Sequence, residues 1–394
     1  MNGGDRTGEQ RALRLAELVD RLRPHSHGLV LHDPDGPAEA LVHAGELVAT
    51  PEAAAAAAER LGARLDRAVP ATDGQLVRLT LRPDVRRRCV ELAAELPAGL
   101  AVAPHHVHVG CPVMFGTPVM FGTGAEAQST AMPPAPPDEV WSPPVTVALL
   151  DTGLDPHPWF VTRPWLSEWG LSPEVLDPER VPDRDRQAGH GTFVAGVLLR
   201  HAPGVTVRHH RSLSSLGLTD DVTVASALRQ VRRRAAARGE RLDVVVLTAG
   251  CHTADDRCPP VLAREIDRHP DTVVVAAAGN GGTDRPFWPA ALPAVIGVAA
   301  TEADGTAAPF SNRGAWVDAA ACGVDVVSSY VRLLAGEEGV APGTTTRVYG
   351  AARWSGTSFA APRVAADVAV ALRQGMSPDQ ARLSVRQPPV RAIR

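Results

Sequence analysis

The sequence predicts an α/β protein in which a three-layer domain with a buried parallel sheet follows a small α+β domain. Apolar runs rich in β-branched residues recur after residue 143, helix-like stretches separate them, and a proline-rich segment precedes them. Strands that are apolar along their whole length are buried on both faces, as in a parallel sheet covered by helices. We therefore expect an N-terminal domain at residues 1–105, a linker at 106–142 and a second domain at 143–394.

Residues 1–105 alternate between helix-like and strand-like segments. The alanine-rich stretch that follows Thr50 has a residue at its start that often caps a helix. Strand–helix–strand units in this order favour a small α+β domain, with the ferredoxin-like arrangement as one candidate. We expect helices at 11–22, 51–61 and 84–96, and strands at 28–32, 46–49, 75–81 and 100–107.

The segment at 106–142 differs in composition from both neighbours. It contains PVMFGT twice in succession, at 112–117 and 118–123, and is then dominated by proline and small residues. Such a composition is typical of a linker, and two copies are too few for a solenoid.

The second domain begins with the apolar run VTVALL at 145–150. Apolar residues keep helical spacing between 220 and 239, where glycine ends the pattern. Functional groups in such a sheet lie where the parallel strands end. Further strands are expected at 204–210, 243–250, 272–279 and 294–300.

Composition excludes several functions. A net charge of −4 and a pI of about 6.4 provide no field to attract nucleic acid or an anionic membrane. The chain has no lysine, which excludes a P-loop, a Schiff base and a Ser–Lys dyad. No signal-like start or membrane-spanning run is present, so we expect a cytoplasmic protein. The five cysteines are expected to be reduced thiols, and CHTADDRC at 251–258 resembles a metal loop only weakly.

Four polar residues stand at expected strand ends or helix starts: Asp151, His190, Asn280 and Ser358. Each alone has an ordinary structural explanation, as a turn residue or a helix cap. Together they fit one mechanism, in which Ser358 attacks a carbonyl and His190 accepts its proton. Asp151 would orient the histidine, and Asn280 with the backbone N–H of Ser358 would bind the oxyanion.

The motifs around these residues, DTG, GHGTFVAG, AAAGN and SGTSFAAP, resemble those of the subtilisin-like serine proteases, the subtilases. The resemblance covers about residues 145–375 and implies a subtilisin-like sheet and a serine endopeptidase acting on peptides or proteins. It implies an edge at 214–218 that pairs with an extended peptide. No acidic loop in the sequence has the pattern of a calcium site, although many relatives bind calcium, so no metal or cofactor is expected. The resemblance also implies a substrate pocket lined by Thr248, Ala249, Gly250, Ala278 and Gly279.

Other interpretations remain open at this point. A sedolisin-type peptidase would carry glutamate in place of His190 and aspartate in place of Asn280. A latent enzyme or pseudoprotease could act as a protein-binding module through its N-terminal domain. That domain is either an inhibitory pro-domain or a recruitment domain. The repeat-containing linker is a candidate self-blocking or self-cleaved sequence, and cleavage there would leave a fragment of about residues 124–394 or shorter.

Overall fold

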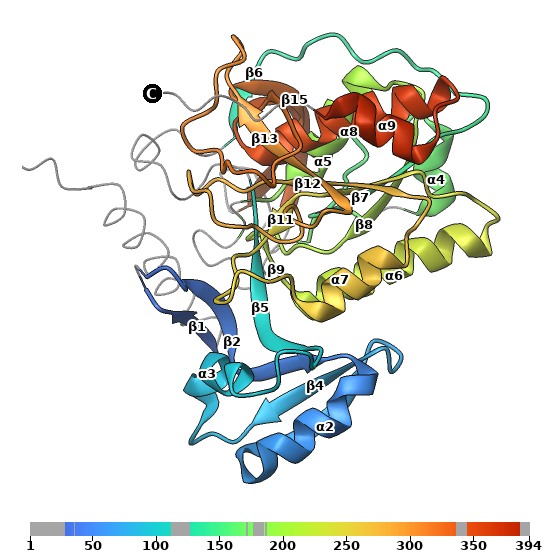
Figure 1. The fold of residues 1–394 in the computed structure, drawn as a ribbon. Helices are drawn as coiled ribbons and strands as arrows, with labels where there is room; N and C mark the ends of the chain where they lie inside the picture. The colour runs from blue at the N-terminus through green and yellow to red at the C-terminus, as the bar shows by residue number, and fades with distance from the viewer. Residues whose placement is uncertain are drawn as a thin grey trace, which may run out of the picture.

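The computed structural model describes residues 28–34, 36–111, 127–170, 172–175, 185, 187–335 and 345–386. The helix expected at 11–22 and both copies of PVMFGT lie outside these ranges. A smaller N-terminal domain and a larger domain share one long strand, β5 (Figure 1).

A six-stranded parallel sheet forms the centre of the larger domain, in the order β14-β13-β12-β10-β7-β8. The strands expected from the sequence are present, although 243–250 divides into β10 and the short β11 (Ala249–Gly250). β14, which was not predicted, adds the far edge. The bounds are β7 (Thr146–Asp151), β8 (Thr206–Arg211), β10 (Val244–Leu247), β12 (Val273–Ala277), β13 (Val295–Thr301) and β14 (Ala319–Cys322).

Helices cover both faces of this sheet and bury a separate apolar core on each. α5 (His190–His201) and α8 (Thr357–Arg373) pack on one face, where Phe193 and Phe359 lie with ring centroids 4.5 Å apart. α6 (Asp221–Ala237) and α7 (Pro260–Asp267) pack on the other. Each fully buried large side chain contributes roughly 1.5–3 kcal/mol. The predicted three-layer α/β architecture is confirmed.

The structure corrects the expected position of one proline. α8 begins at Thr357, so Pro362 lies in its second turn rather than its first. The proline ring there removes the N–H that would bond the Ser358 carbonyl.

Residues before α8 form a strand in a hairpin that the sequence analysis missed. The hairpin consists of β15 (Val326–Ala335) and β16 (Thr345–Trp354), and β6 (Gln128–Thr130) pairs with β16. This domain also contains the short helices α4 (Pro164–Trp169) and α9 (Pro378–Val385).

The N-terminal domain has the ferredoxin-like order of strands and helices. Its antiparallel strands lie in the order β5-β2-β4-β3, with α2 and α3 in the connections. Thr50 precedes α2 but its side chain makes no capping hydrogen bond, and the helix expected at 84–96 is shorter than predicted. The bounds are β1 (Leu29–His32), β2 (Ala40–Ala49), α2 (Pro51–Leu61), β3 (Leu65–Ala71), β4 (Leu76–Leu81), α3 (Cys89–Ala94) and β5 (Val102–Gly110), with 3₁₀ turns at Gly62–Arg64 and Arg86–Arg88.

Strand β5 leaves the N-terminal sheet and enters the larger domain, so the predicted boundary at 105 falls inside one strand (Figure 1). Its last residues pair antiparallel with β9 (Leu218–Asp220) on one side and β11 on the other. The two domains are therefore joined by a continuous hydrogen-bonded sheet.

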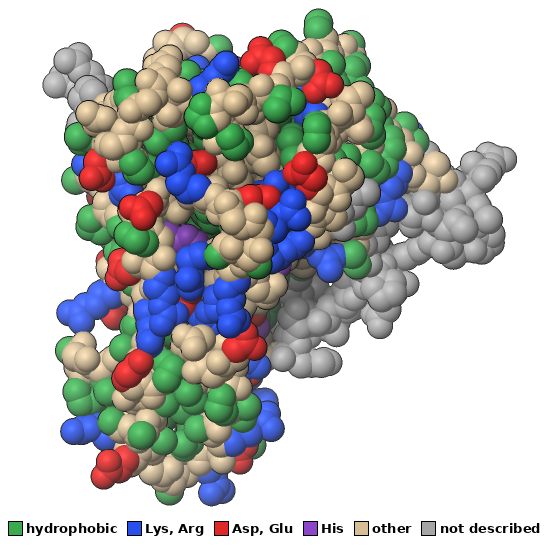
Figure 2. All heavy atoms as spheres, turned by 90° about the vertical axis from the view of Figure 1, so that its right-hand side faces the viewer, with side chains coloured by type: hydrophobic (Ala, Val, Ile, Leu, Met, Phe, Trp, Pro, Cys, Tyr) green, Lys and Arg blue, Asp and Glu red, His purple; other side chains and the backbone are tan. Residues whose placement is uncertain are grey.

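The N-terminal domain also docks on the outer helices α6 and α7. Val48 and Leu76 pack against Val222, Ala225 and Val261 in a shared apolar cluster. Figure 2 shows arginine side chains gathered where the smaller domain, below, meets the larger one. Their bonds across the junction include Arg264 to Glu52 at 2.9 Å, Arg233 to Asp73 at 2.7 Å and Arg229 to the Thr72 carbonyl at 2.7 Å.

Within the ranges described, no helix has both the length and the apolar character needed to cross a membrane.

Candidate active site

Asp151, His190 and Ser358 come from three different elements and meet at the carboxyl end of the parallel sheet. Asp151 ends β7, His190 begins α5, and Ser358 lies in the first turn of α8. His190 Nδ1 lies 2.6 Å from Asp151 Oδ1, and all three side chains are buried. Trp354 and Phe359 flank the imidazole, with ring centroids 5.5 and 5.3 Å away.

The Asp151 carboxylate is held ionised inside the protein. Burial opposes ionisation, but the charge of His190 and hydrogen bonds from His190, Thr248 and the Thr152 N–H outweigh it and lower the pKa of Asp151. Thr248 Oγ1 donates to Asp151 Oδ2 at 2.6 Å, and the Thr152 N–H donates to Oδ1 at 2.7 Å. An ionised carboxylate at Nδ1 fixes the histidine tautomer and leaves Nε2 free to accept a proton. Among the residues described, His190 Nε2 has no hydrogen-bond partner.

The glycines beside His190 allow a close approach of two backbone segments. A Cβ on Gly191 would lie 2.5 Å from the Gly153 carbonyl oxygen, and Gly189 has a φ of 85°. Glu174, which the sequence analysis missed, fixes the same contact, because its Oε2 accepts the N–H groups of both Gly153 and Gly189. Burial raises the pKa of Glu174 to about 7.

Two hydrogen-bond donors converge on one carbonyl oxygen beside Ser358. Asn280 Nδ2 donates to the Cys111 carbonyl at 2.7 Å, and the Ser358 N–H donates to the same oxygen at 3.1 Å. Thr357 holds the amide of Asn280 in place, since its N–H and Oγ1 donate to Asn280 Oδ1 at 3.1 and 2.8 Å. Ser358 Oγ donates to the Thr248 carbonyl at 3.1 Å.

Asn312 shapes the loop that carries Asn280, and it was not among the predicted site residues. It is fully buried; its Nδ2 donates to the Ala278 carbonyl, and its Oδ1 accepts from the N–H groups of Gly281 and Thr283. The scarcity of asparagine in this chain was the one sequence signal that could have identified it.

The cleft beside Ser358 holds an extended segment of the chain itself. Val109 and Gly110 pair with Gly250 and Ala249, while the Thr248 carbonyl accepts the Cys111 N–H at 2.9 Å. On the other side, Val109 pairs with Leu218, and the Gly110 N–H donates to the Gly217 carbonyl at 2.8 Å.

The other two residues predicted to line the pocket are engaged within the larger domain. The Ala278 N–H bonds to the Val298 carbonyl and its carbonyl accepts from Asn312. Gly279 bonds to Asn312 and Thr357.

The last two residues of the extended segment fit the cleft closely. A Cβ on Gly110 would lie 2.3 Å from Gln187 Oε1 and 3.0 Å from Leu213 Cδ2, so only glycine fits there without rearrangement. The Cys111 side chain is buried, and burial raises the pKa of its thiol to about 12. All five cysteines are free thiols, as expected.

Glu174 gives a pH dependence of stability that can be measured. Its native pKa of about 7 exceeds the usual 4.5, so the native state binds this proton more tightly than the unfolded state does. The contribution of Glu174 to the free energy of unfolding is fully present below about pH 4.5 and is lost as the pH rises to about 7. The free energy of unfolding of the wild type, relative to Glu174→Gln, should fall across that window by up to about 3 kcal/mol.

Urea unfolding at several pH values measures this difference, with Glu59→Gln, at an exposed position on α2, as the matched control. A difference between wild type and Glu174→Gln that stays constant from pH 4.5 to 7 would contradict the raised pKa.

The chain is similar to a known family and to several characterised proteins. The model of the subtilase family matches residues 143–392. A thermophilic serine proteinase of Bacillus sp. (strain AK1) is 30% identical over 257 residues, which cover 61% of this chain and 55% of the relative. Subtilisin Savinase of Lederbergia lenta is 29% identical over 251 residues, which cover 61% of this chain and 80% of that protein. A solved cold adapted subtilisin-like serine proteinase aligns at 24% identity with a TM-score of 0.44, covering 65% of this chain and 86% of that one. The family model spans more than half of the chain, which therefore belongs to the subtilase family of serine peptidases.

Proposed function

We propose that the chain is a serine endopeptidase in which Ser358, His190 and Asp151 form the catalytic triad and Asn280 is an oxyanion donor. Ser358 Oγ attacks the carbonyl carbon of a peptide bond while His190 Nε2 takes its proton. The same proton then passes to the leaving nitrogen, and water repeats the sequence on the acyl-enzyme. Asp151 keeps the imidazole in the required tautomer and stabilises its cationic form. This mechanism uses side chains and backbone groups alone and needs no cofactor.

The observation that carries this proposal is the position of the Cys111 carbonyl oxygen. Asn280 Nδ2 and the Ser358 N–H both donate to it, and these are the donors that would stabilise the negative oxygen of a tetrahedral intermediate. Strands β9 and β11 align the same segment on both sides, as a bound peptide substrate would be aligned. His190 and Asn280 also argue against a sedolisin-type site.

We further propose that the N-terminal domain inhibits the enzyme by occupying this cleft. The pairing of β5 with β9 and β11 uses the backbone groups that a substrate would use, so the two cannot bind together. A tethered inhibitor acts at an effective concentration in the millimolar range, so even a weak sequence is held in place. The alternative of a binding module with an inactive site has no support from the intact arrangement of His190, Asp151 and Asn280.

The segment at the active site ends at Cys111, which lies within the linker proposed from the sequence as self-blocking but ahead of the cut expected near residue 124. Cleavage after Cys111 would break the bond to Pro112, and its leaving group would be the proline nitrogen. The PVMFGT repeat itself lies outside the described residues. We propose self-blocking by residues 107–111 as the state of the full chain.

Loosening the contact at Gly110 tests both proposals. Gly110→Ala should displace β5, because its Cβ would meet Gln187 and Leu213. A fluorophosphonate probe should then label Ser358 at least about tenfold faster than in the wild-type chain, a change that corresponds to about 1.4 kcal/mol of lost docking. Peptide hydrolysis should rise in parallel and vanish in Gly110→Ala/Ser358→Ala. Gly99→Ala, whose Cβ would meet nothing within 4 Å, is the control and should behave like the wild type.

Two results would count against these proposals. A wild-type chain that is already labelled at the rate of Gly110→Ala would remove the inhibitory role. A Gly110→Ala chain in which Ser358 stays unlabelled and no peptide is hydrolysed would remove the peptidase.

The same contact predicts the substrate. A side chain at the second residue before the cleaved bond would have to displace the end of Gln187 and would contact Leu213, which favours glycine there, and the buried Cys111 site suits a small apolar side chain. A fluorogenic peptide ending in Val-Gly-Ala should therefore have a kcat/KM at least about tenfold above that of Val-Ala-Ala in the Gly110→Ala enzyme, since one unfavourable contact in a pocket changes this ratio by roughly 10–200-fold. Equal values for the two peptides would show that Gln187 moves aside at no cost.

Asn280 can be tested for its role in the transition state. Asn280→Ala in the Gly110→Ala background should lower kcat by about a hundredfold or more with little change in KM, because one oxyanion donor is lost. Initial rates with the Val-Gly-Ala peptide give both constants, and a thermal melt checks the bonds from Thr357 to Asn280. A change confined to KM would rule out the oxyanion role.

A further inference from the structure

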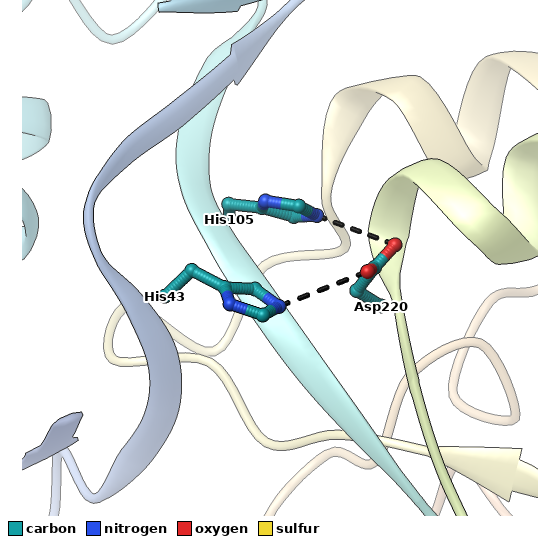
Figure 3. A group of neighbouring side chains, drawn as sticks. All are labelled: His43, His105 and Asp220. Atoms are coloured by element: carbon teal, nitrogen blue, oxygen red, sulfur yellow. Dashed lines mark ion pairs between the residues drawn. The ribbon is translucent and has the colours of Figure 1, made fainter. Parts of the chain in front are cut away.

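Two histidines and an aspartate meet where β5 passes from the N-terminal domain to the larger domain (Figure 3). His43 lies on β2, His105 on β5, and Asp220 ends β9 and caps α6. Both imidazole rings turn a nitrogen towards the Asp220 carboxylate, as the figure shows. The three donor atoms lie within 4.8 Å of one another.

The distances within this group are longer than a typical charge-assisted hydrogen bond. His105 Nε2 lies 3.3 Å from Asp220 Oδ1, and His43 Nε2 lies 3.7 Å from Oδ2. A charge-assisted N–H···O bond would be about 2.8 Å long. Two ligands that share a tetrahedral zinc ion, each bound at 2.0–2.2 Å, lie roughly 3.3 Å apart. The spacing therefore suits three ligands around an ion better than direct ion pairs.

The hydrogen bonds around His105 and Asp220 orient the side-chain atoms that would bind an ion. Glu46 Oε2 lies 2.8 Å from His105 Nδ1, so a carboxylate accepts the Nδ1 proton, and Nε2 points to Asp220, where an ion would take the place of its proton. A carboxylate behind a histidine is the usual second contact of a metal-bound imidazole. His105 Nε2 is buried, and its contact among the described residues is the 3.3 Å approach to Asp220 Oδ1. Asp220 Oδ1 accepts the capping bond from the Thr223 N–H, and each oxygen of the carboxylate faces one of the two imidazoles.

The group is also accessible from solvent. The side chain of His43 is 32% exposed and that of Asp220 is 22% exposed, while His105 is 1% exposed. An ion could enter past His43 and keep a water molecule as its fourth ligand. Three protein ligands with one open position form a common zinc arrangement.

A second group in the described residues, His108, Asp221 and Cys251, lacks these features. All three are buried, and His108 Nε2 lies 2.7 Å from Asp221 Oδ1, a hydrogen-bond distance. Asp221 Oδ2 accepts the N–H of His106 at 2.7 Å. Direct hydrogen bonds satisfy this carboxylate, so this group is a closed polar cluster within the core.

We propose that His43, His105 and Asp220 bind one divalent transition-metal ion of the zinc type, with Glu46 orienting His105. Two nitrogen ligands and one carboxylate suit zinc and its neighbours rather than calcium or magnesium, which prefer oxygen. Two of the ligands belong to the N-terminal domain and one belongs to β9, the edge strand that pairs with β5. The ion therefore clamps the two domains together at the strand that enters the cleft.

Metal binding is measured on the full chain carrying Ser358→Ala, which stays uncut and makes the result independent of the proposed peptidase activity. After removal of metal with a chelator, calorimetric titration with Zn²⁺ should give one ion per chain, and Co²⁺ should produce the visible absorption of a tetrahedral site. His43→Ala and Asp220→Asn should each weaken binding by at least about a hundredfold, and Glu46→Gln by roughly 10–100-fold. His32→Ala, which removes a half-buried histidine outside the group, should have no effect.

Circular dichroism of each variant verifies the fold. If His43→Ala is unstable, Asp220→Asn still tests the site, because its side chain retains an oxygen that can cap α6. Hydrogen exchange of the β5 and β9 amides should slow when Zn²⁺ is added. Absence of binding, or binding that neither His43→Ala nor Asp220→Asn weakens, would show an ordinary histidine–aspartate cluster and overturn the proposal. Exchange that stays unchanged in both strands would overturn the clamp.

Discussion

The buried hydrogen bond between Asp151 and His190 is the constraint on which the rest of the site depends. A charged carboxylate inside a protein is costly unless several donors satisfy it. Asp151 obtains them from Thr248, which directly follows β10, from His190 at the start of α5, and from its own loop. Each donor fixes the distance between two elements, so the sheet edge and the start of α5 can meet in only one way. The close approach of Gly191 to Gly153 is the steric part of the same constraint.

The second organising feature is a peptide backbone between two sheet edges. β9 and β11 both present unpaired backbone groups to the cleft until β5 pairs with them. Open strand edges attract other strands, and natural proteins usually cover them. Here the cover is a segment of the same chain, and it ends with a carbonyl oxygen between Asn280 and Ser358. In the proposed function, substrate recognition and self-occupation therefore depend on identical hydrogen bonds, and close contacts such as the one at Gly110 decide which of the two prevails.

Much of this architecture could be predicted from the sequence because its signals are local. Continuous apolar runs predicted the parallel strands, and glycine-flanked polar residues at their ends predicted that Asp151, His190, Asn280 and Ser358 would meet. β3 was missed because it contains a proline and is mostly exposed, so it has neither alternation nor an apolar run. Glu174 lies in an irregular segment, where no local pattern marks its function. The group of His43, His105 and Asp220 was missed because it forms only when two domains meet, and no spacing along the chain encodes that contact.

The position of β5 links domain docking to chemistry at a single point. The apolar contacts on α6 and α7 and the arginine bonds at the junction hold the N-terminal sheet. They lie far from Ser358 along the fold, and exposed ion pairs of this kind contribute little individually. Their effect reaches the active site because β5 is a continuous strand and cannot leave β11 without also leaving β9. Weak contacts spread over the interface therefore act together to fix the register of β5 between β9 and β11. In that register Gly110, which has no side chain, must lie beside Gln187 and Leu213.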